Sequence, residues 1–230
     1  MTLQIAALAS GTGSNVSALQ EHIEASRLDA RICLLLSNNP QAPVTTMARE
    51  KNIPVWARSH KEYPDRASFD HDMLTAIRQS GADTVVLAGY MRILSDFFVR
   101  AFPGRIMNIH PAILPSFPGA HGGRDALAYG VRLAGPTVHF VDELMDNGPI
   151  IIQAVVPVGC NDAEADLMPR IHALEHRIYA QALQWLAQDR LLIVGRRVEL
   201  LPDGERSCRA GSCGENESGL WLVSPALEGF

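Results

Sequence analysis

The sequence predicts an α/β fold: a Rossmann-like, mostly parallel twisted sheet with helices on both faces. Apolar strand-like runs, such as residues 3–9, 30–37 and 84–88, alternate with helical patterns through the first two thirds of the chain. These runs are continuously apolar, which is typical of parallel strands that are buried on both faces. The two observations together favour a sheet with crossover helices.

Hydrophobic spacing predicts the individual elements. Val16, Leu19 and Ile23 recur at helical spacing and predict a helix over 15–27. Gly81 is expected to end a later helix, because glycine readily adopts the left-handed conformation that closes helices. The other expected helices span 44–51, 67–80, 96–101 (begun by Ser95) and 163–188, and the other expected strands span 54–57, 105–110, 137–141, 149–158, 191–194 and 198–201.

The bulk composition excludes several classes of protein. A chain of 230 residues that is 47% hydrophobic and 20% charged can bury one sizeable core, in one or two domains. Its net charge of −5 argues against a nucleic-acid partner, since phosphate contacts need a basic face. No run approaches the roughly 20 apolar residues of a membrane span, and no secretory signal is visible. We therefore expect a cytoplasmic protein with reduced cysteines and no membrane partner.

The first motif, SGTGSN at residues 10–15, stands directly after the first strand and opens the first helix. A helix N-terminus presents unpaired N–H groups and partial positive charge, both of which suit an anion. The motif lacks the third glycine of a dinucleotide fingerprint and the lysine of a P-loop. It therefore favours a phosphate group, although a simple tight turn also explains it.

Two further motifs stand at the ends of later strands. GYMRIL at residues 89–94 follows the strand over 84–88, where ligands of open α/β sheets bind. Asn108 and His110 end the strand over 105–110, and alternation along the strand places both side chains on one side. Asn can donate to a developing oxyanion and His can titrate near neutrality. A structural histidine remains the alternative.

Pro111 begins a long segment rich in Pro and Gly that runs through Gly123, and we expect this segment to be a loop that covers the site. Asp146 lies in the turn between two later strands. A carboxylate beside His110 would position the imidazole and favour its charged form. By itself, Asp before Asn-Gly is an ordinary turn residue.

Together these segments resemble phosphoribosylglycinamide formyltransferase, the folate-dependent family of purine synthesis. The resemblance covers SGTGSN, AGYMRIL, MNIHPAILPSFPG, TVHFVDELMDNGPII and LEHRIYAQAL, in the family's order and spacing. It implies the formyltransferase fold and transfer of a formyl group from 10-formyltetrahydrofolate to phosphoribosylglycinamide, with no metal. It also implies a domain over 1–201, with a phosphate-binding half over about 1–100 and a folate and catalytic half over about 101–201. Beyond it, the polar and Gly-rich composition after Pro202 predicts a flexible tail over 202–230, with unremarkable thiols at Cys208 and Cys213.

The resemblance assigns roles at the matching positions. His110, Asn108 and Asp146 match the catalytic residues. The remaining matches are Gly13, Ser14, Asn15 and Glu175 for the phosphorylated acceptor, and Arg66, Met91, Arg92, Ile93, Leu94 and Asn108 for the folate. The chain departs from many relatives at Thr12 and in the segment over 120–124, and nothing in the resemblance explains the tail.

Three alternative functions remain. A formyltetrahydrofolate deformylase would be expected to carry an additional N-terminal domain. A methionyl-tRNA formyltransferase would be expected to carry a C-terminal domain and a basic surface. A non-catalytic nucleotide-binding module would not need Asn108, His110 and Asp146 together. The sequence leaves open whether the protein is a monomer or a homodimer, and where the apolar end of the tail docks.

Overall fold

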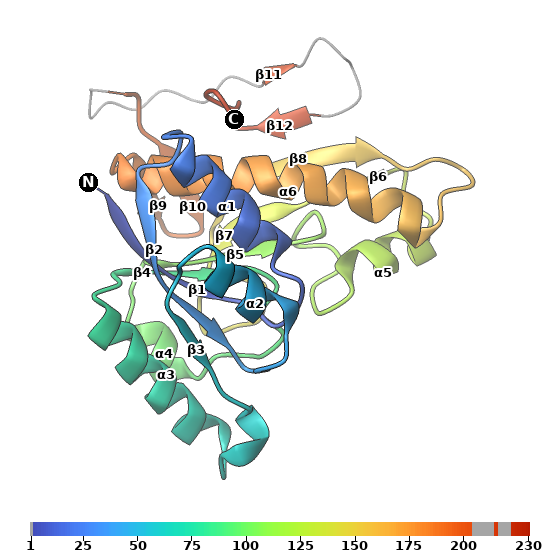
Figure 1. Ribbon diagram of the computed structural model, residues 1–230. Coiled ribbons are helices and arrows are strands. Elements are labelled where there is room, and N and C mark those ends of the chain that lie inside the picture. Colours follow the sequence, from blue (N-terminus) through green and yellow to red (C-terminus); the bar gives the residue numbers. More distant parts are fainter. Residues whose placement is uncertain (1, 204–213, 216–221) are drawn as a thin grey trace. The chain divides into compact units, whose positions relative to one another are not determined.

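Figure 1 shows the computed structural model of the protein, which describes residues 2–203, 214–215 and 222–230. The chain forms two compact units, and each is described by itself. Unit 1 consists of Met1–Asn108 and Val141–Glu143, and unit 2 of Ile109–Phe140 and Leu144–Phe230. The expected domain over 1–201 and tail over 202–230 stay predictions.

Unit 1 contains a parallel sheet in the order β3-β2-β1-β4-β5. Its strands are β1 (Leu3–Leu8), β2 (Ala30–Ser37), β3 (Val55–Ala57), β4 (Thr84–Leu87) and β5 (Ile106–His110). β1 lies at the centre of this sheet. Its residues are almost entirely buried, because strands pair with it on both sides and helices cover both faces of the sheet. The boundary between the units runs through β5.

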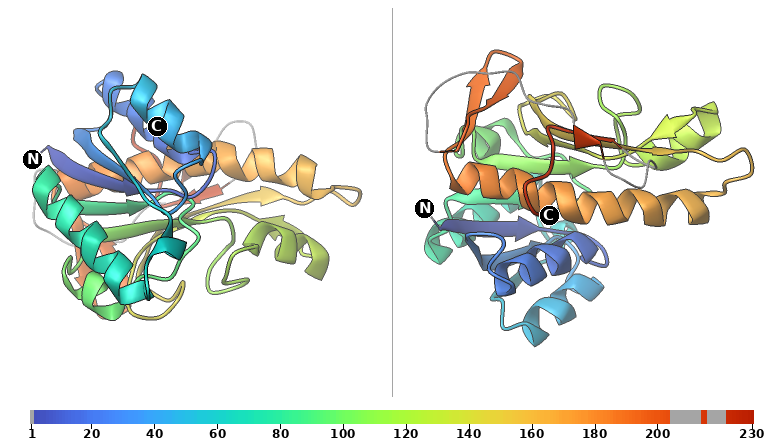
Figure 2. Two further views of the ribbon diagram at one scale, coloured as in Figure 1. Left: turned by 60° about the horizontal axis from the view of Figure 1, so that its bottom comes forward. Right: turned by 90° about the horizontal axis from the view of Figure 1, so that it is seen from above.

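Helices cover both faces of the unit 1 sheet. They are α1 (Ser14–Glu24), α2 (Pro43–Glu50), η1 (His60–Glu62), α3 (Arg66–Ser80) and α4 (Asp96–Arg100). Figure 2 (left) shows α1 and α2 above the strands and α3 and α4 below them. Side chains alternate along a strand, so Ala6 and Leu8 of β1 share the face on which Phe69, Met73 and Phe98 pack.

Unit 2 is built around β8 (Ile150–Pro157), which is paired on both sides. β7 (Thr137–Phe140) and β12 (Leu222–Ser224) both run antiparallel to β8. The other strands are β6 (Leu133–Ala134), β9 (Leu191–Val194), β10 (Arg197–Leu200) and β11 (Gly214–Glu215). Helices α5 (Gly122–Tyr129) and α6 (Glu164–Ala187) complete the unit, and α6 packs on β7 and β8.

The structure confirms the predicted α/β class, and most predicted helices and strands lie within a few residues of their expected positions. Gly81 ends α3 with φ 75°, as expected. Ser95 precedes α4, but its side chain makes no capping bond, and its N–H instead donates to Asp70 Oδ2 at 2.7 Å.

The structure sharpens the predictions in two regions. The segment that begins at Pro111 is a loop as expected, but helix α5 already begins at Gly122, inside the expected loop. The apolar end of the tail, whose docking place was open, pairs with β8 as strand β12. The prediction of a flexible stretch with unremarkable thiols at Cys208 and Cys213 lies outside the described residues.

Within the described residues, no helix is both long enough and apolar enough to span a bilayer.

Candidate functional site

In unit 1, Ser10 ties together the ends of three neighbouring strands. Its hydroxyl donates to Asn38 Oδ1 at 2.6 Å, just after β2. The same hydroxyl accepts from the Met91 N–H at 2.9 Å, and the Ser10 N–H donates to the Gly89 carbonyl at 3.1 Å. The first two predicted motifs therefore meet at one edge of the unit 1 sheet, beyond its carboxyl ends, as the topology rule anticipates.

Gly13 makes the start of α1 available to an anion. It has φ 82°, and a Cβ built on it would stand 2.3 Å from Val44 Cγ2, so glycine is required both for conformation and for space. Gly13 caps α1 without a side chain. Ser14 is exposed and Asn15 is buried beside it. The first turn of α1 therefore presents backbone N–H groups and a hydroxyl at a positive helix end.

In unit 1, the segment over 91–94, which is predicted to line the folate pocket, exposes some of its side chains and buries others. Met91 and Ile93 are exposed, at 64% and 56%, whereas Leu94 is buried. Arg92 turns inward, with its guanidinium 5.4 Å from the centre of the Phe69 ring.

Behind the segment, burial raises the pKa of Tyr90 well above its usual range, with Asp70 adding to the effect. Arg66 lies at the exposed start of α3, in a groove of about 790 Å³ that Asp96 and Arg100 of α4 also line.

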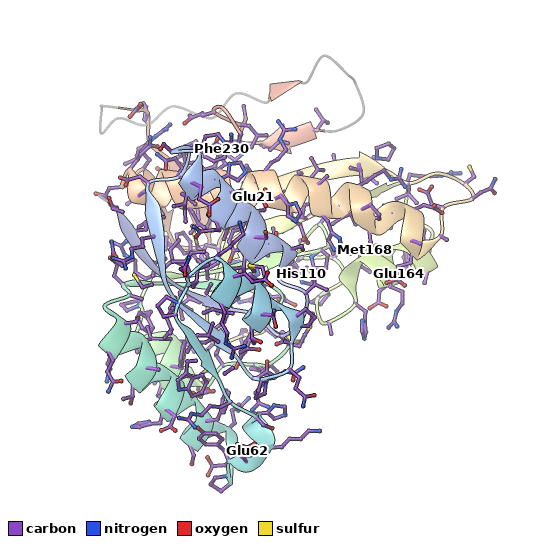
Figure 3. All side chains as sticks on the ribbon, in the orientation of Figure 1. Glu21, Glu62, His110, Glu164, Met168 and Phe230 are labelled. Carbon is purple, nitrogen blue, oxygen red and sulfur yellow. The ribbon has the colours of Figure 1, made fainter. Side chains whose placement is uncertain are left out.

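In unit 2, the structure brings His110, which is labelled in Figure 3, close to Asp146. His110 Nδ1 lies 3.7 Å from Asp146 Oδ2, with side-chain exposures of 5% and 12%. The Gly119 N–H donates to the same carboxylate oxygen at 2.7 Å. Asp146 has φ 51°, a conformation that Asp tolerates better than most residues. The predicted pairing of an imidazole with a carboxylate is therefore present in a largely buried place.

A loop carbonyl determines which ring nitrogen of His110 carries a hydrogen. His110 Nε2 lies 2.8 Å from the Phe117 carbonyl oxygen. A carbonyl oxygen can only accept, so Nε2 carries a hydrogen in this arrangement. Nδ1 is then the ring nitrogen that faces Asp146. The ring is thus held from both sides, by the loop and by the carboxylate.

A second imidazole flanks Asp146, and sequence reasoning missed it. His139 Nε2 lies 3.9 Å from Asp146 Oδ1, and His139 is only 2% exposed. His139 Nδ1 is 2.8 Å from the Phe140 carbonyl, which accepts its hydrogen. The signal that could have found His139 is its polarity inside the apolar run over 137–141, where a buried polar side chain needs a partner.

Gly122 lets the start of α5 approach His110 closely. A Cβ on Gly122 would lie 2.8 Å from His110 Nε2 and 2.9 Å from the Phe117 carbonyl oxygen. At neighbouring Gly123 the nearest atom would be Met168 Sδ, in a flexible side chain. The sequence placed both glycines in a variable segment, and only the packing shows which one borders the candidate catalytic pair.

The remaining predicted residues are placed within their own units. Asn108 is half-buried on β5 at the end of unit 1, two residues before His110 on the same strand. Glu175 is buried on α6 of unit 2, at 4% exposure. The roles of these residues, and a site that joins Gly13, Ser14, Asn15 and Glu175, stay predictions. Among the described residues, no three or more His, Cys, Asp or Glu gather as a metal site would require.

The chain is similar to known proteins over the region that contains these residues. The model of the formyl transferase family matches residues 3–183. The chain is 39% identical to phosphoribosylglycinamide formyltransferase of Bacillus subtilis, over 80% of this chain and 94% of that protein. It is 41% identical to the trifunctional purine biosynthetic protein adenosine-3 of Drosophila melanogaster, of whose length it spans only 14%.

Solved structures agree with the sequence comparison. Glycinamide ribonucleotide transformylase 1 from Symbiobacterium toebii is 42% identical, with a TM-score of 0.86 over 87% of this chain and 95% of that chain. A formyltetrahydrofolate deformylase from Pseudomonas syringae has a TM-score of 0.81, but it is 28% identical and this chain covers 67% of it. The chain therefore belongs to the formyl transferase family, as a phosphoribosylglycinamide formyltransferase.

Proposed function

We propose that the protein transfers the formyl group of 10-formyltetrahydrofolate to the amine of 5-phosphoribosylglycinamide, a step of de novo purine biosynthesis. The observation that carries the proposal is the buried His110–Asp146 pair, closed over by the Phe117 carbonyl and the Gly119 N–H. The pair supplies a positioned imidazole for the proton movements of formyl transfer.

The residues of the pair would act on the tetrahedral species that forms when the amine attacks the formyl carbon. Protonated His110 and the Asn108 amide would donate to its oxyanion, and one such donor is typically worth about 10²- to 10³-fold in turnover. In this structure His110 Nε2 bonds to the Phe117 carbonyl. The oxyanion would take the place of the Phe117 carbonyl at Nε2, while the Gly119 N–H still holds the Asp146 carboxylate. Asp146 would hold the protonated ring in place and relay a proton through water from the amine to the folate nitrogen, which leaves as its bond to the formyl carbon breaks.

The acceptor and the folate would bind at the other predicted residues. The α1 start at Gly13, Ser14 and Asn15 would hold the acceptor phosphate through backbone N–H groups. Glu175 would accept from the ribose hydroxyls. The backbone over 91–94 would line the folate pocket, and the cations Arg66 and Arg92 would face the carboxylates of the folate. No part of this scheme calls for a metal.

Formyltetrahydrofolate deformylase is the second candidate, because a deformylase shares the fold. The two functions differ in whether the formyl group goes to an amine or to water. We also propose that the enzyme acts in the cytoplasm as a monomer or a homodimer, with no nucleic-acid or membrane partner.

An acceptor-dependence assay with purified protein tests the proposal. Formyl transfer should require phosphoribosylglycinamide and fail with the dephosphorylated riboside, since the start of α1 suits a phosphate. Equal rates with both acceptors would remove the phosphate assignment. Rapid loss of formyl-folate without an acceptor would identify a deformylase instead.

A further inference from the structure

The last nine residues, 222–230, return to unit 2 as an added strand. Val223 of β12 pairs with Ala154 of β8, and Ser224 pairs with Gln153. Val223 is only 2% exposed, whereas its neighbour Leu222 is 49% exposed. The segment therefore buries one specific side chain in unit 2. It lies beyond residue 183, where the family match ends.

A polar clasp on α6 holds the end of this segment. The Glu228 carboxylate accepts from Trp185 Nε1 at 3.0 Å and from both terminal nitrogens of Arg190 at 2.6 and 2.9 Å. The Glu228 N–H donates to Gln181 Oε1 at 2.5 Å. A bidentate Arg–carboxylate contact restricts the orientation of both side chains and pairs their charges. Glu228 therefore has one well-defined position on unit 2.

Arg177 extends the clasp to the last residue of the chain. Its Nη2 donates to the backbone oxygen of Phe230 at 2.6 Å and its Nε donates to the same atom at 3.1 Å (Phe230 is labelled in Figure 3). Arg177, Gln181 and Trp185 stand four residues apart and so share one face of α6. The clasp is thus a continuous stripe along the helix.

β12 makes β8 an interior strand at Gln153. Gln153 pairs with Thr137 of β7 on one side and with Ser224 on the other. Its side-chain Nε2 donates to the Leu114 carbonyl and to Thr137 Oγ1, both at 2.9 Å. Thr137 Oγ1 donates to the Ala112 carbonyl at 2.7 Å and accepts from the Leu114 N–H at 3.1 Å. Gln153 and Thr137 therefore anchor the base of the loop that follows Pro111.

The tip of that loop bonds to the candidate catalytic pair, through the Phe117 carbonyl and the Gly119 N–H. Strand pairing thus links Ser224 to Gln153, and hydrogen bonds link Gln153 to the base of the loop whose tip contacts His110. We infer that the C-terminal segment 222–230 is a positioning segment: it fixes Gln153 and thereby holds the loop over His110 and Asp146. Only the expected effect on turnover rests on the proposed function; the positioning of the loop does not.

Hydrogen exchange on the full-length chain tests the positioning without any assay of activity. In Val223→Asp, the Leu114 and Gly119 amides should exchange faster by on the order of tenfold, because the loop base loosens and local opening becomes easier. Leu222→Asp is the matched control, since it places the same charge on an exposed position of the same strand, and it should leave both amides unchanged.

Turnover supplies the second readout. Val223→Asp should lower kcat about threefold to tenfold well below its unfolding temperature, within the range of coupling seen along contact networks. Gln153→Met should do the same. The double variant should lose no more than the larger single loss, because both changes act through one contact. If Val223→Asp does not fold, Glu228→Ala is the replacement variant, because it removes the hydrogen bonds that the Glu228 carboxylate accepts from Trp185 and Arg190. The same changes in amide exchange and in kcat are expected for it.

Two outcomes would overturn the inference. The first is a lower unfolding temperature in Val223→Asp with unchanged loop exchange and unchanged kcat, which would make the segment a stabilising strand only. The second is losses that multiply in the double variant, which would separate the segment from Gln153. Absence of formyl transfer in the wild-type protein would count against the proposed function alone, since the exchange experiment would still decide the positioning.

Discussion

In unit 1 the candidate anion site is made of backbone at the ends of parallel strands, whereas in unit 2 the candidate catalytic cluster is made of side chains that a loop brings together. Gly13 and Ser10 lie within a few residues of one strand end. His110, Phe117 and Asp146 come from a strand, a loop and a distant turn. The first arrangement follows from local chain geometry, and the second depends on long-range packing.

Their sensitivities should differ accordingly. A backbone site tolerates changes of side chain but fails where the chain loses space or a special φ angle. A side-chain cluster fails when one partner is removed, because the remaining buried polar groups lose their orientation and their hydrogen bonds.

Asp146→Asn should cause the largest loss. A positioned proton-transfer group is worth about 10²- to 10⁴-fold, so turnover should fall by that order in Asp146→Asn and in His110→Ala. Folate binding, measured by equilibrium titration, should stay nearly normal. The double variant should lose little more than either single variant, because the two residues act as one unit. Near-normal single-turnover rates in both variants would make this cluster structural.

Gly122→Ala tests how closely the loop and α5 pack on His110. The added methyl group meets His110 Nε2 and the Phe117 carbonyl, so we expect about 1–3 kcal/mol of overpacking and a lower kcat. Gly123→Ala is the matched control, because the flexible Met168 side chain can move aside. Equal kcat losses in the two variants, measured at saturating substrate, would contradict this account of the packing.

Gly13→Ala should damage the backbone site of unit 1 while leaving the unit 2 cluster intact. The methyl group would clash with Val44, and φ 82° is unfavourable for Ala, so we expect a cost of about 1–3 kcal/mol. The loss should appear as a higher KM for the acceptor. Gly11→Ala is the control, because nothing lies within 4 Å of its added Cβ. A normal acceptor KM in Gly13→Ala would move the phosphate site elsewhere.

The same contrast explains what could be predicted from the sequence. SGTGSN and GYMRIL were placed correctly because parallel strands bring their carboxyl ends to one edge, which is a property of topology. The pairing of His110 with Asp146 came from the family resemblance, since alternation along β5 says nothing about a turn 36 residues later. His139 and α5 were missed because a buried partner and a helix in a Pro- and Gly-rich segment are decided by tertiary packing. β12 was missed because its pairing with β8 joins segments that are far apart in sequence.

Glu228→Gln should have the smallest effect, and its pH dependence has a definite sign. The Arg190 hydrogen bonds hold the pKa of Glu228 below its usual 4.5, against an opposing effect of burial. The folded-state pKa is lowered, so the stabilisation is fully present above the unfolded-state value and is lost as pH falls through the folded-state value. The side chain is 44% exposed and solvent screens the pair, so the contribution should be about 1 kcal/mol or less.

Urea unfolding of the full-length protein at several pH values measures this contribution. Wild type should exceed Glu228→Gln in stability above pH 4.5, and the two should converge below it, because wild-type Glu228 is then protonated as well. In an Arg190→Met background the same substitution should change stability little at any pH, since the main cause of the shift is gone. A difference that persists unchanged to low pH would mean that Glu228 stabilises unit 2 through its neutral hydrogen bonds. In that case the clasp on α6 would depend on shape and not on charge.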